Sequence, residues 1–471
     1  MEPSAPGTSS STGADTQTTR RKLSGYELYR EVLGSPKYVV APMVDQSELA
    51  WRRLSRRYGA QLVYTPMINA KMFMDPTNKS FRSANFDIPS GEEGDTSTDR
   101  PLIVQFCANN PEQLLTSAKV LESYCDAVDL NLGCPQDIAK KGHYGSFLQD
   151  EWELIYTLIN TLHENLNVPV TAKFRVFPTI EKTVEYAKML ERAGAQILTC
   201  HGRLREQRGQ NTGVADWQKI RAVKQSVSVP VFANGNILFQ SDILRCLEET
   251  GCDAVMSAEG NLYNVALFNG LPETLPTPFV APSTPALPSS MPTATLISGS
   301  LPSVSSQSSI PISIIPPTHP AHPSHPGYYS DSSILLRHPR SADIALEYIS
   351  IVKSLKTRTC VSAVKGHLFK ILLPALTKEV DLRERLGRAK VGERPKAEAD
   401  WGGWLAEYVE ICEELKERME KTEREATKEG TIPLKDLITI DPNTGFEVMP
   451  HWLLQPYWRK SPPPSTSVAE E

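Results

Sequence analysis

One reactive side chain, a cysteine, stands on a tight turn, which is an unusual position for a thiol. The stretch AVDLNLGCPQ covers residues 127–136, and its first half is apolar in the manner of a buried strand. Gly133, Cys134 and Pro135 then follow, a combination that is typical of a turn. Such a turn holds the thiol clear of the strand, whereas most intracellular cysteines are small buried hydrophobes. The position therefore raises the question of what an exposed thiol would do there.

Polar side chains also end the other strand-like segments of the same region. Any one of them has a plain explanation as a strand cap or a loop residue. Together they describe a rim of hydrogen-bond donors around a single thiol, which indicates a reaction site. The residues at these strand ends are Pro42, Met43, Thr65, Gln105, Asn131, Lys173, Arg175, His201, Asn234, Gly235, Asn236, Ala258 and Glu259.

Two of these strand ends are suited to binding a phosphate. FANGNI and SAEGNLYN follow the seventh and eighth strand-like runs, and loops at these places hold phosphate in many barrels. Lys173 ends the fifth run, where it would stabilise negative charge on an electron-rich ring; its alternative is a surface lysine. The combination suits flavin mononucleotide (FMN), with its phosphate at the last two strands and its ring over the mouth.

The elements that must position these residues alternate regularly along the chain. Short β-branched runs are followed by polar loops and amphipathic helices over about 230 residues, which favours a (β/α)8 TIM barrel. An open doubly wound sheet would also alternate, but its first strand usually ends in a glycine-rich turn, and here that strand ends in APMVDQSE. The strand-like runs are residues 38–42, 61–65, 102–106, 127–131, 168–175, 196–200, 229–233 and 254–257.

Composition changes sharply beyond the barrel. Residues 271–330 hold 14 of the 37 prolines and one formally charged side chain, which predicts a disordered insertion. Helical patterns return after it, including a long charged helix within residues 404–428. The predicted units are a disordered tail (1–34), the catalytic barrel (35–270), the Pro/Ser-rich insertion (271–335), a smaller all-α domain (336–430) and a C-terminal extension (431–471).

Overall composition excludes several classes of protein. The net charge of −5 over 471 residues argues against a globally basic nucleic-acid coat. Eight cysteines without a C-x-x-C pair indicate reduced thiols inside a cell and no zinc site. No apolar run reaches eighteen residues, so no membrane span is expected, and the first twenty residues do not resemble a secretory signal. Cytoplasmic and nuclear residence both stay open, since Arg20, Arg21 and Lys22 form a weak nuclear-type cluster.

Charge is distributed unevenly over the predicted helical domain. Residues 353–396 contain 12 Lys or Arg against 4 Asp or Glu, whereas residues 398–429 contain 5 against 11. The acidic run is typical of a solvated helix with i,i+4 ion pairs. The basic run is either another solvated face or a surface that contacts phosphates. Its candidate residues are Lys353, Lys356, Arg358, Lys365 and Lys370.

Several segments together resemble the tRNA-dihydrouridine synthases. They are APMVDQSELAWR, DLNLGCPQ, KKGHYGSFL, TAKFRVF, CHGRLREQRG, VFANGNI and PHWLLQPYWR. The resemblance is strongest to the eukaryotic branch that reduces uridines 16 and 17 of the D-loop. It implies a bound FMN, NADPH or NADH as electron donor, tRNA as substrate and a C-terminal helical domain that grips the tRNA. We further expect a monomer without a metal.

The resemblance also implies roles for individual residues. Cys134 becomes the general acid that protonates C5 of the uridine while hydride reaches C6. A free thiol has a pKa of about 8.5, so at neutral pH it is mostly protonated and can donate. The implied FMN contacts are Pro42, Met43, Val44, Gln105, Lys173, His201, Asn234, Gly235, Asn236, Ala258 and Glu259. The implied substrate contacts are Asn131, Arg175 and Arg203 at the mouth and Lys353, Lys356, Arg358 and Lys365 on the helical domain.

One residue departs from the family pattern, and other functions stay possible. Glu259 stands where many relatives carry arginine, so only its backbone amide would help to bind a phosphate. A flavin barrel that reduces a free pyrimidine or enone is the main alternative function, and an RNA-binding protein with an inactive barrel is a weaker one. If the helical domain does not hold tRNA, the alternative surface is the first barrel helix with Arg52, Arg53, Arg56 and Arg57.

Overall fold

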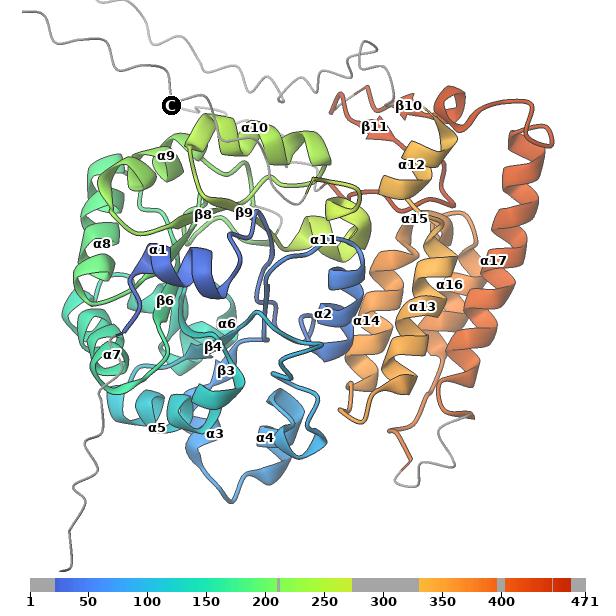
Figure 1. The fold of residues 1–471 in the computed structure, drawn as a ribbon. Helices are drawn as coiled ribbons and strands as arrows, with labels where there is room; N and C mark the ends of the chain where they lie inside the picture. The colour runs from blue at the N-terminus through green and yellow to red at the C-terminus, as the bar shows by residue number, and fades with distance from the viewer. Residues whose placement is uncertain (1–21, 210–211, 273–329, 396–402, 443, 459–471) are drawn as a thin grey trace, which may run out of the picture.

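The computed structural model describes residues 22–209, 212–272, 330–395, 403–442 and 444–458. Its larger unit is a parallel barrel with helices outside it (Figure 1). The strands are β1 (Tyr38–Val40), β2 (Val63–Tyr64), β4 (Leu102–Cys107), β5 (Ala127–Leu132), β6 (Val170–Arg175), β7 (Ile197–His201), β8 (Val231–Asn234) and β9 (Ala254–Ser257). All eight predicted strands are confirmed, each within two residues at either end.

The barrel closes through its first and last strands. β1 pairs with β9, the remaining strands follow in order around to β2, and a bridge between Val39 and Leu62 joins β2 back to β1. Almost every strand residue is buried, because side chains fill the inside and helices cover the outside. All strands run the same way, so their carboxyl ends share one rim.

Helices of the expected amphipathic type cover the barrel. They are α2 (Leu49–Arg57), α5 (Pro111–Leu121), α7 (Trp152–Asn165), α8 (Ile180–Arg192), α9 (Trp217–Ser226), α10 (Gln240–Thr250) and the short α11 (Glu259–Tyr263). Local chemistry sets several of their ends: the side chains of Asn110, Thr179 and Asp216 accept hydrogen bonds from the first turns of α5, α8 and α9. Gly251 ends α10 at φ +69°, the left-handed conformation that glycine adopts most easily.

The last part of the predicted disordered tail is ordered, so that prediction is wrong for residues 22–34. They form α1 (Gly25–Glu27) and one turn of π-helix, Leu28–Val32. Leu28 and Tyr29 are buried in a cluster with Val39 and Phe232 inside the barrel, at the ends where the strands begin. Leu28, Tyr29 and Leu33 are the buried apolar side chains that dock this short segment. The predicted disorder of residues 1–21 lies outside the described part of the chain.

An excursion after β2 has no counterpart in the sequence prediction. It contains β3 (Ile68–Asn69), α3 (Ala70–Met74), α4 (Lys79–Asn85) and a loop that returns to β4. Arg52 of α2 is fully buried against this loop, with Nη2 2.6 Å from Asp99 Oδ2 and 3.1 Å from Glu93 Oε2. Burial raises the pKa of Glu93 to about 7 in spite of this arginine. The excursion is therefore tied to the barrel by a buried ion-pair network.

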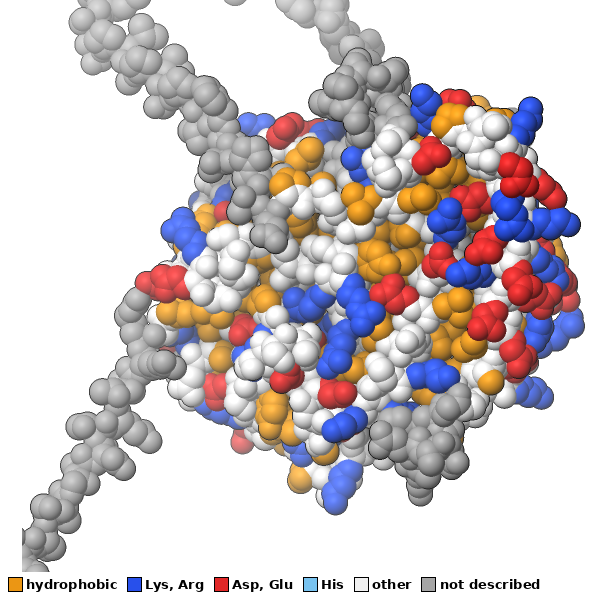
Figure 2. All heavy atoms as spheres, turned by 45° about the vertical axis from the view of Figure 1, so that its right-hand side comes forward, with side chains coloured by type: hydrophobic (Ala, Val, Ile, Leu, Met, Phe, Trp, Pro, Cys, Tyr) orange, Lys and Arg blue, Asp and Glu red, His pale blue; other side chains and the backbone are white. Residues whose placement is uncertain are grey.

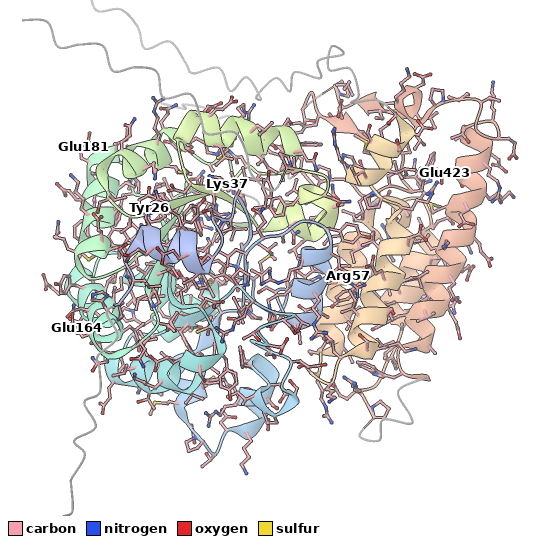
Figure 3. The ribbon with its side chains drawn as sticks, viewed as in Figure 1. Tyr26, Lys37, Arg57, Glu164, Glu181 and Glu423 are labelled. Atoms are coloured by element: carbon pink, nitrogen blue, oxygen red, sulfur yellow. The ribbon has the colours of Figure 1, made fainter. Side chains whose placement is uncertain are left out.

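This network uses part of the first barrel helix, which was the alternative tRNA surface. Arg52 has no exposed area, Arg56 donates to the carbonyls of Asp99 and Pro101, and Arg57 pairs with Glu347 of the helical unit at 2.8 Å. Arg57 is labelled in Figure 3, on the side of α2 that faces the helical unit. Arg52 and Arg56 are therefore used within the barrel, whereas the Arg57 side chain stays 57% exposed in its ion pair.

The second unit is all-helical, as predicted. It consists of α12 (Asp331–Arg337), α13 (Ser341–Ser354), α14 (Val361–Ile371), α15 (Leu373–Leu376), α16 (Val380–Arg388) and the long α17 (Ala406–Ala426). Since α12 begins at residue 331, the predicted insertion ends earlier than 335, and its residues 273–329 lie outside the described chain. On the outer helices of Figure 2 basic and acidic side chains alternate, in keeping with the ion pairs that Arg385 and Arg418 make between α16 and α17.

The helical unit and the barrel share one hydrophobic core. Leu49, Trp51 and Leu54 of α2 belong to the same buried cluster as α13, α14 and α17. At its centre Glu48 accepts a hydrogen bond from Tyr348 (2.7 Å) and lies 3.1 Å from His367 Nε2. The His367 ring also stacks on Trp51 at 4.2 Å. The two units are therefore docked by a buried polar and aromatic contact.

The end of the described chain crosses from one unit to the other. Met449, Trp452, Leu453 and Leu454 are buried in the core of the helical unit. Beyond them, Tyr457 packs against Tyr263, which follows β9, with ring centroids 5.0 Å apart. This segment thereby carries aromatic side chains to the rim of the barrel.

Candidate active site

The parallel register places the predicted strand-end residues side by side on one rim. Asn131 of β5 pairs with Lys173 of β6, and Arg175 pairs with His201 of β7. His201 in turn pairs with Asn234 of β8. Residues that are far apart in sequence therefore meet at the carboxyl ends of the strands, where barrels place their chemistry.

A cavity of about 910 Å³ opens at this rim. Of the predicted site residues it is lined by Arg175, His201, Arg203, Asn234, Gly235, Asn236, Ala258 and Glu259. Cys134 itself is not among the lining residues, although the next residue, Pro135, is. The cavity wall does not include Pro42, Met43, Val44, Gln105, Asn131 or Lys173, which lie at the same strand ends.

The cysteine turn is held from both sides. Asn131 Oδ1 accepts hydrogen bonds from the backbone N–H groups of Gly133 (3.1 Å) and Cys134 (2.9 Å). The Cys134 carbonyl accepts from the backbone N–H (3.1 Å) and the hydroxyl (2.9 Å) of Ser146. Gly145 allows this approach, since it has φ +66° and a Cβ there would lie 2.8 Å from the Cys134 oxygen. The turn is therefore fixed rather than loose.

The thiol environment favours the protonated form. Burial raises the pKa of Cys134 above its ordinary value, although the backbone around Gln136 and the cations Arg175 and Lys173 act in the opposite direction. Cys134 is half-buried, whereas Cys107 and Cys200 have at most 1% of their surface exposed. Cys134 is thus a partly accessible thiol that carries a proton at neutral pH, as a general acid must.

Two arginines hold the loops around the thiol. Arg175 Nε donates to the Gly133 carbonyl at 2.8 Å, and its Nη1 donates to the carbonyls of Leu204 and Gln207. Arg208 donates to the Pro135 carbonyl and pairs with Asp137, both at 2.8 Å. Arg175 was expected to orient the substrate, and the structure gives it contacts to backbone carbonyls on either side of the thiol turn.

Lys173 is a cation with a lowered pKa. Its Nζ donates to Asn234 Oδ1 at 2.9 Å. Burial, together with the nearby Arg175, lowers the pKa of Lys173 to about 8, while Asp129 opposes this shift. The lysine therefore still carries a charge at neutral pH but loses it in mildly alkaline solution.

His201 is kept neutral by its surroundings. Burial and the charges of Lys173, Arg175 and Arg203 lower the pKa of His201 well below its usual range. Arg203 Nη1 lies 3.1 Å from His201 Nε2, and an arginine can only donate, so Nε2 accepts and Nδ1 carries the proton. Arg203 Nη2 also donates to Asn236 Oδ1 at 3.0 Å.

The two expected phosphate loops present backbone rather than side chains. Asn234 Nδ2 donates to the Met256 carbonyl, and the Asn236 amide bonds both backbone groups of Ala215, so these side chains are used within the protein. Gly235 lies at φ +115°, where a Cβ would meet Ala215 at 2.6 Å, and a Cβ on Gly260 would meet the Ile237 carbonyl at 2.2 Å. The cavity wall at 234–238 and 256–260 fits a group held by backbone amides, with Arg203 as the nearby cation.

Glu259 departs from a cationic phosphate site, and a lysine of the other unit lies near it. Burial lowers the pKa of Lys370 on α14, and the nearby charge of Glu259 opposes this shift. α14 packs beside α11, which begins at Glu259. The helical unit therefore partly offsets the negative charge at this loop.

The first barrel loop follows β1, and Gln105 lies within β4. Met43 N donates to Ser47 Oγ, and the same hydroxyl donates back to the Met43 carbonyl, which fixes the loop of Pro42, Met43 and Val44. Gln105 is fully buried, and both ends of its amide bond other side chains, Asp129 and Asn131. Any contact between Gln105 and a bound ring would use the second hydrogen of the amide nitrogen or the second lone pair of the amide oxygen.

The basic residues of the helical unit divide into two groups. Lys365 donates to the carbonyls of Gly387 and Ala389 at the end of α16, and Lys370 donates to the Gly366 carbonyl. Lys356 and Arg358 are exposed, and Lys353 is partly exposed. The structure thus gives Lys365 a role in capping a helix, and Lys356 and Arg358 are the most exposed of the five.

Several residues at the site were missed from the sequence, and Arg208 is one of them. Asp129 lies inside the strand that leads to Cys134, and Ser146 lies in KKGHYGSFL, a segment that was quoted only for its resemblance. Tyr457 and Trp458 line the cavity from the C-terminal segment, and only the motif PHWLLQPYWR pointed to them. No periodicity connects these positions with the thiol.

Within the described ranges, the structure holds no group of three or more His, Cys, Asp or Glu side chains with the arrangement of a metal site. None of the described helices combines the length and the apolar character that crossing a bilayer requires.

The fold and this rim define a (β/α)8-barrel enzyme with a placed thiol, a cationic lysine and a backbone-lined cavity. The sequence pattern described as dihydrouridine synthase (Dus) matches residues 39–311. The chain is 43% identical to the Saccharomyces cerevisiae tRNA-dihydrouridine(16/17) synthase, over 93% of this chain and 87% of that protein. It is 40% identical to a Mus musculus protein named as similar to that enzyme (94% and 72%) and 39% identical to the Schizosaccharomyces pombe enzyme (93% and 92%). This chain belongs to the dihydrouridine synthase family.

Proposed function

We propose that this chain reduces uridine to 5,6-dihydrouridine in tRNA, at positions 16 and 17 of the D-loop. We further propose that it holds FMN at the barrel mouth and takes electrons from NADPH or NADH. The observation that carries the proposal is the protonated, partly accessible Cys134 on a braced turn, on the same rim as Lys173. The whole-length similarity to tRNA-dihydrouridine(16/17) synthases supports the substrate.

The residues of the chain divide the work of the reaction. When bound, the flavin supplies the hydride that is added to C6 of the uracil ring. Cys134 Sγ–H gives its proton to C5, which completes the addition of two hydrogens, and the thiolate then regains a proton from solvent. Lys173 holds a positive charge at the mouth, and Arg175 and Arg208 keep the thiol turn in place.

The helical unit distinguishes this proposal from reduction of a free small molecule. An enzyme for a free pyrimidine gains nothing from a second domain with exposed cations. A base within a folded RNA must leave its stack to reach a barrel mouth, which costs a few kcal/mol. Phosphate contacts outside the barrel are the natural source of compensation.

The bound cofactor gives a direct test of the proposal. Purified protein is expected to be yellow, and acid release should yield FMN rather than the dinucleotide, identified by chromatography and mass. The cavity at 234–238 and 256–260 would hold its phosphate through backbone amides. A colourless protein that cannot be reconstituted with FMN would contradict the proposal.

Neutralising Lys353, Lys356 and Arg358 together is expected to weaken tRNA binding. Each phosphate contact contributes about −0.7 to −0.9 to the slope of log affinity against log salt, so the slope should flatten by roughly two units. The rate at which NADPH reduces the flavin should not change, because that step needs only the barrel. Filter binding over a salt series and stopped-flow absorbance measure the two quantities.

A matched control removes three cations elsewhere. Lys188, Arg192 and Arg221 are exposed on α8 and α9, on the side of the barrel away from the helical unit in Figure 1. Their neutralisation should leave the salt slope within half a unit. Equal slopes for the two triple variants would mean that tRNA is held elsewhere.

Removing the Trp458 ring is expected to raise KM for tRNA by about tenfold. Tyr457 and Trp458 line the cavity, and Trp458 packs edge-on against Phe446 with centroids 4.9 Å apart. An aromatic wall beside a reacting nucleotide suits stacking of a base, and such contacts are worth about 1–3 kcal/mol. Trp458→Ala should show the loss and Trp458→Phe should restore most of it. An unchanged KM in Trp458→Ala would contradict this role.

A further inference from the structure

A chain of hydrogen bonds runs from a buried carboxylate to the thiol turn. Gln105 Nε2 donates to Asp129 Oδ2 at 2.7 Å, and Asn131 Nδ2 donates to Gln105 Oε1 at 2.8 Å. Asn131 Oδ1 then accepts from the backbone N–H groups of Gly133 and Cys134. Asp129 and Gln105 have no exposed surface and Asn131 has 8%. The chain is therefore isolated from water along most of its length.

The donor-to-acceptor direction of this chain of hydrogen bonds is fixed by the groups at its two ends. The backbone N–H groups at one end can only donate, and an ionised carboxylate at the other end can only accept. Each of the two amides between them must then receive a hydrogen bond on its oxygen and donate one from its nitrogen. Turning over either amide would place oxygen against oxygen or nitrogen against nitrogen in a buried site, which is costly.

We infer that Asp129 is a positioning residue, which sets the orientation of Gln105 and Asn131 and thereby holds the turn that presents Cys134. The inference rests on the proposed role of Cys134 as the acid, and it assigns Asp129 no contact with substrate. Thr171 Oγ1 holds the carboxylate in place from β6 by donating to Asp129 Oδ1 at 2.6 Å.

The surroundings of Asp129 are consistent with this role. The titratable groups that face it are Tyr64 of β2 and Lys173 of β6. Burial raises the pKa of Asp129 to about 6, while the hydrogen bonds from Thr171 and Gln105 and the charge of Lys173 lower it. At neutral pH the carboxylate is thus mostly ionised and acts as an acceptor.

Exchanging the residue types at positions 129 and 131, so that Asn stands at 129 and Asp at 131, tests the inference. Asn131→Asp sets a second acceptor-only group against Gln105, so the amide has no satisfactory orientation. Asp129→Asn alone keeps an oxygen for Gln105 and should change little. In the double variant Gln105 can turn over, donating to Asp at 131 and accepting from Asn at 129, which satisfies every group again.

Amide hydrogen exchange of Gly133 and Cys134 and thermal unfolding, both on the full chain, give the readouts. Asn131→Asp is expected to lower protection by about tenfold, and the double variant should return to within about threefold of the parent, since members of one network couple strongly. The control is Asp129→Leu with Asn131→Asp, which removes the repulsion between carboxylates but gives Gln105 no donor. This variant should not restore the protection of the Gly133 and Cys134 amides.

Two outcomes would overturn the inference. Either the double variant is no better than Asn131→Asp alone, or leucine at position 129 rescues as well as asparagine, which would reduce the effect to charge repulsion. If Asn131→Asp cannot be purified, Gln105→Glu creates the same conflict with Asp129 and should likewise be rescued by Asp129→Asn. None of these readouts needs flavin turnover or tRNA, so they stand apart from a failure of the proposed function.

Discussion

Cys134→Ala is expected to lose most dihydrouridine formation while keeping its flavin and its affinity for tRNA. Proton transfer by a placed acid is typically worth about 10²–10⁴-fold, and the buried surroundings keep this thiol protonated. Single-turnover assays, with dihydrouridine measured in tRNA after flavin reduction, isolate the step. The expected loss is in the rate of that step, not in KM.

The other thiols near the strand ends provide controls for this result. Cys107 and Cys200 are buried, and burial raises the pKa of Cys107 to about 12. Alanine at either position should leave the rate within a few-fold of the parent. A fully active Cys134→Ala would instead show that water or another side chain is the acid.

Lys173→Ala is expected to slow reduction of the bound flavin by NADPH by about 10²-fold, because a fixed charge in a buried site contributes strongly to a reaction that develops negative charge. The lysine is cationic below its pKa of about 8 and neutral above it. The parent rate should therefore fall as the pH rises through about 8. Stopped-flow absorbance of the flavin from pH 6 to about 9.5 measures this alkaline fall in rate.

Lys173→Arg serves as the matched variant. Arginine keeps its charge over this range, so its profile should lack the fall near pH 8 even if its overall rate is lower. An alkaline limb that persists in both Lys173→Ala and Lys173→Arg would belong to another group. The ionisation of Lys173 would then not set the pH dependence of flavin reduction.

The barrel and most of the rim could be predicted because both follow from local pattern. Strand periodicity located all eight strands, and the rule that barrel chemistry lies at their carboxyl ends then selected Asn131, Lys173, His201 and Asn234 without knowledge of any contact. Parallel register in the structure brings these four onto neighbouring strands.

Residues whose structural role depends on partners far away in the sequence could not be predicted in the same way. Asp129 reads as a strand residue until register sets it opposite Gln105 and Thr171. Arg52 reads as one of four basic residues on an exposed helix until the 93–99 loop covers it. Lys365 reads as a phosphate ligand until the end of α16 supplies its acceptors. In each case the deciding interaction joins segments that no sequence window contains.

Dihydrouridine formation by purified components distinguishes reduction of a uridine within tRNA from reduction of a free small molecule. Purified protein, NADPH and an unmodified tRNA transcript are incubated together, and dihydrouridine is mapped by reverse-transcription stops after borohydride treatment. Reduction within tRNA predicts new dihydrouridine at positions 16 and 17 that is absent without NADPH and absent with Cys134→Ala. Flavin that is reduced by NADPH and reoxidised by a free pyrimidine or enone, with no dihydrouridine in the tRNA, would contradict it.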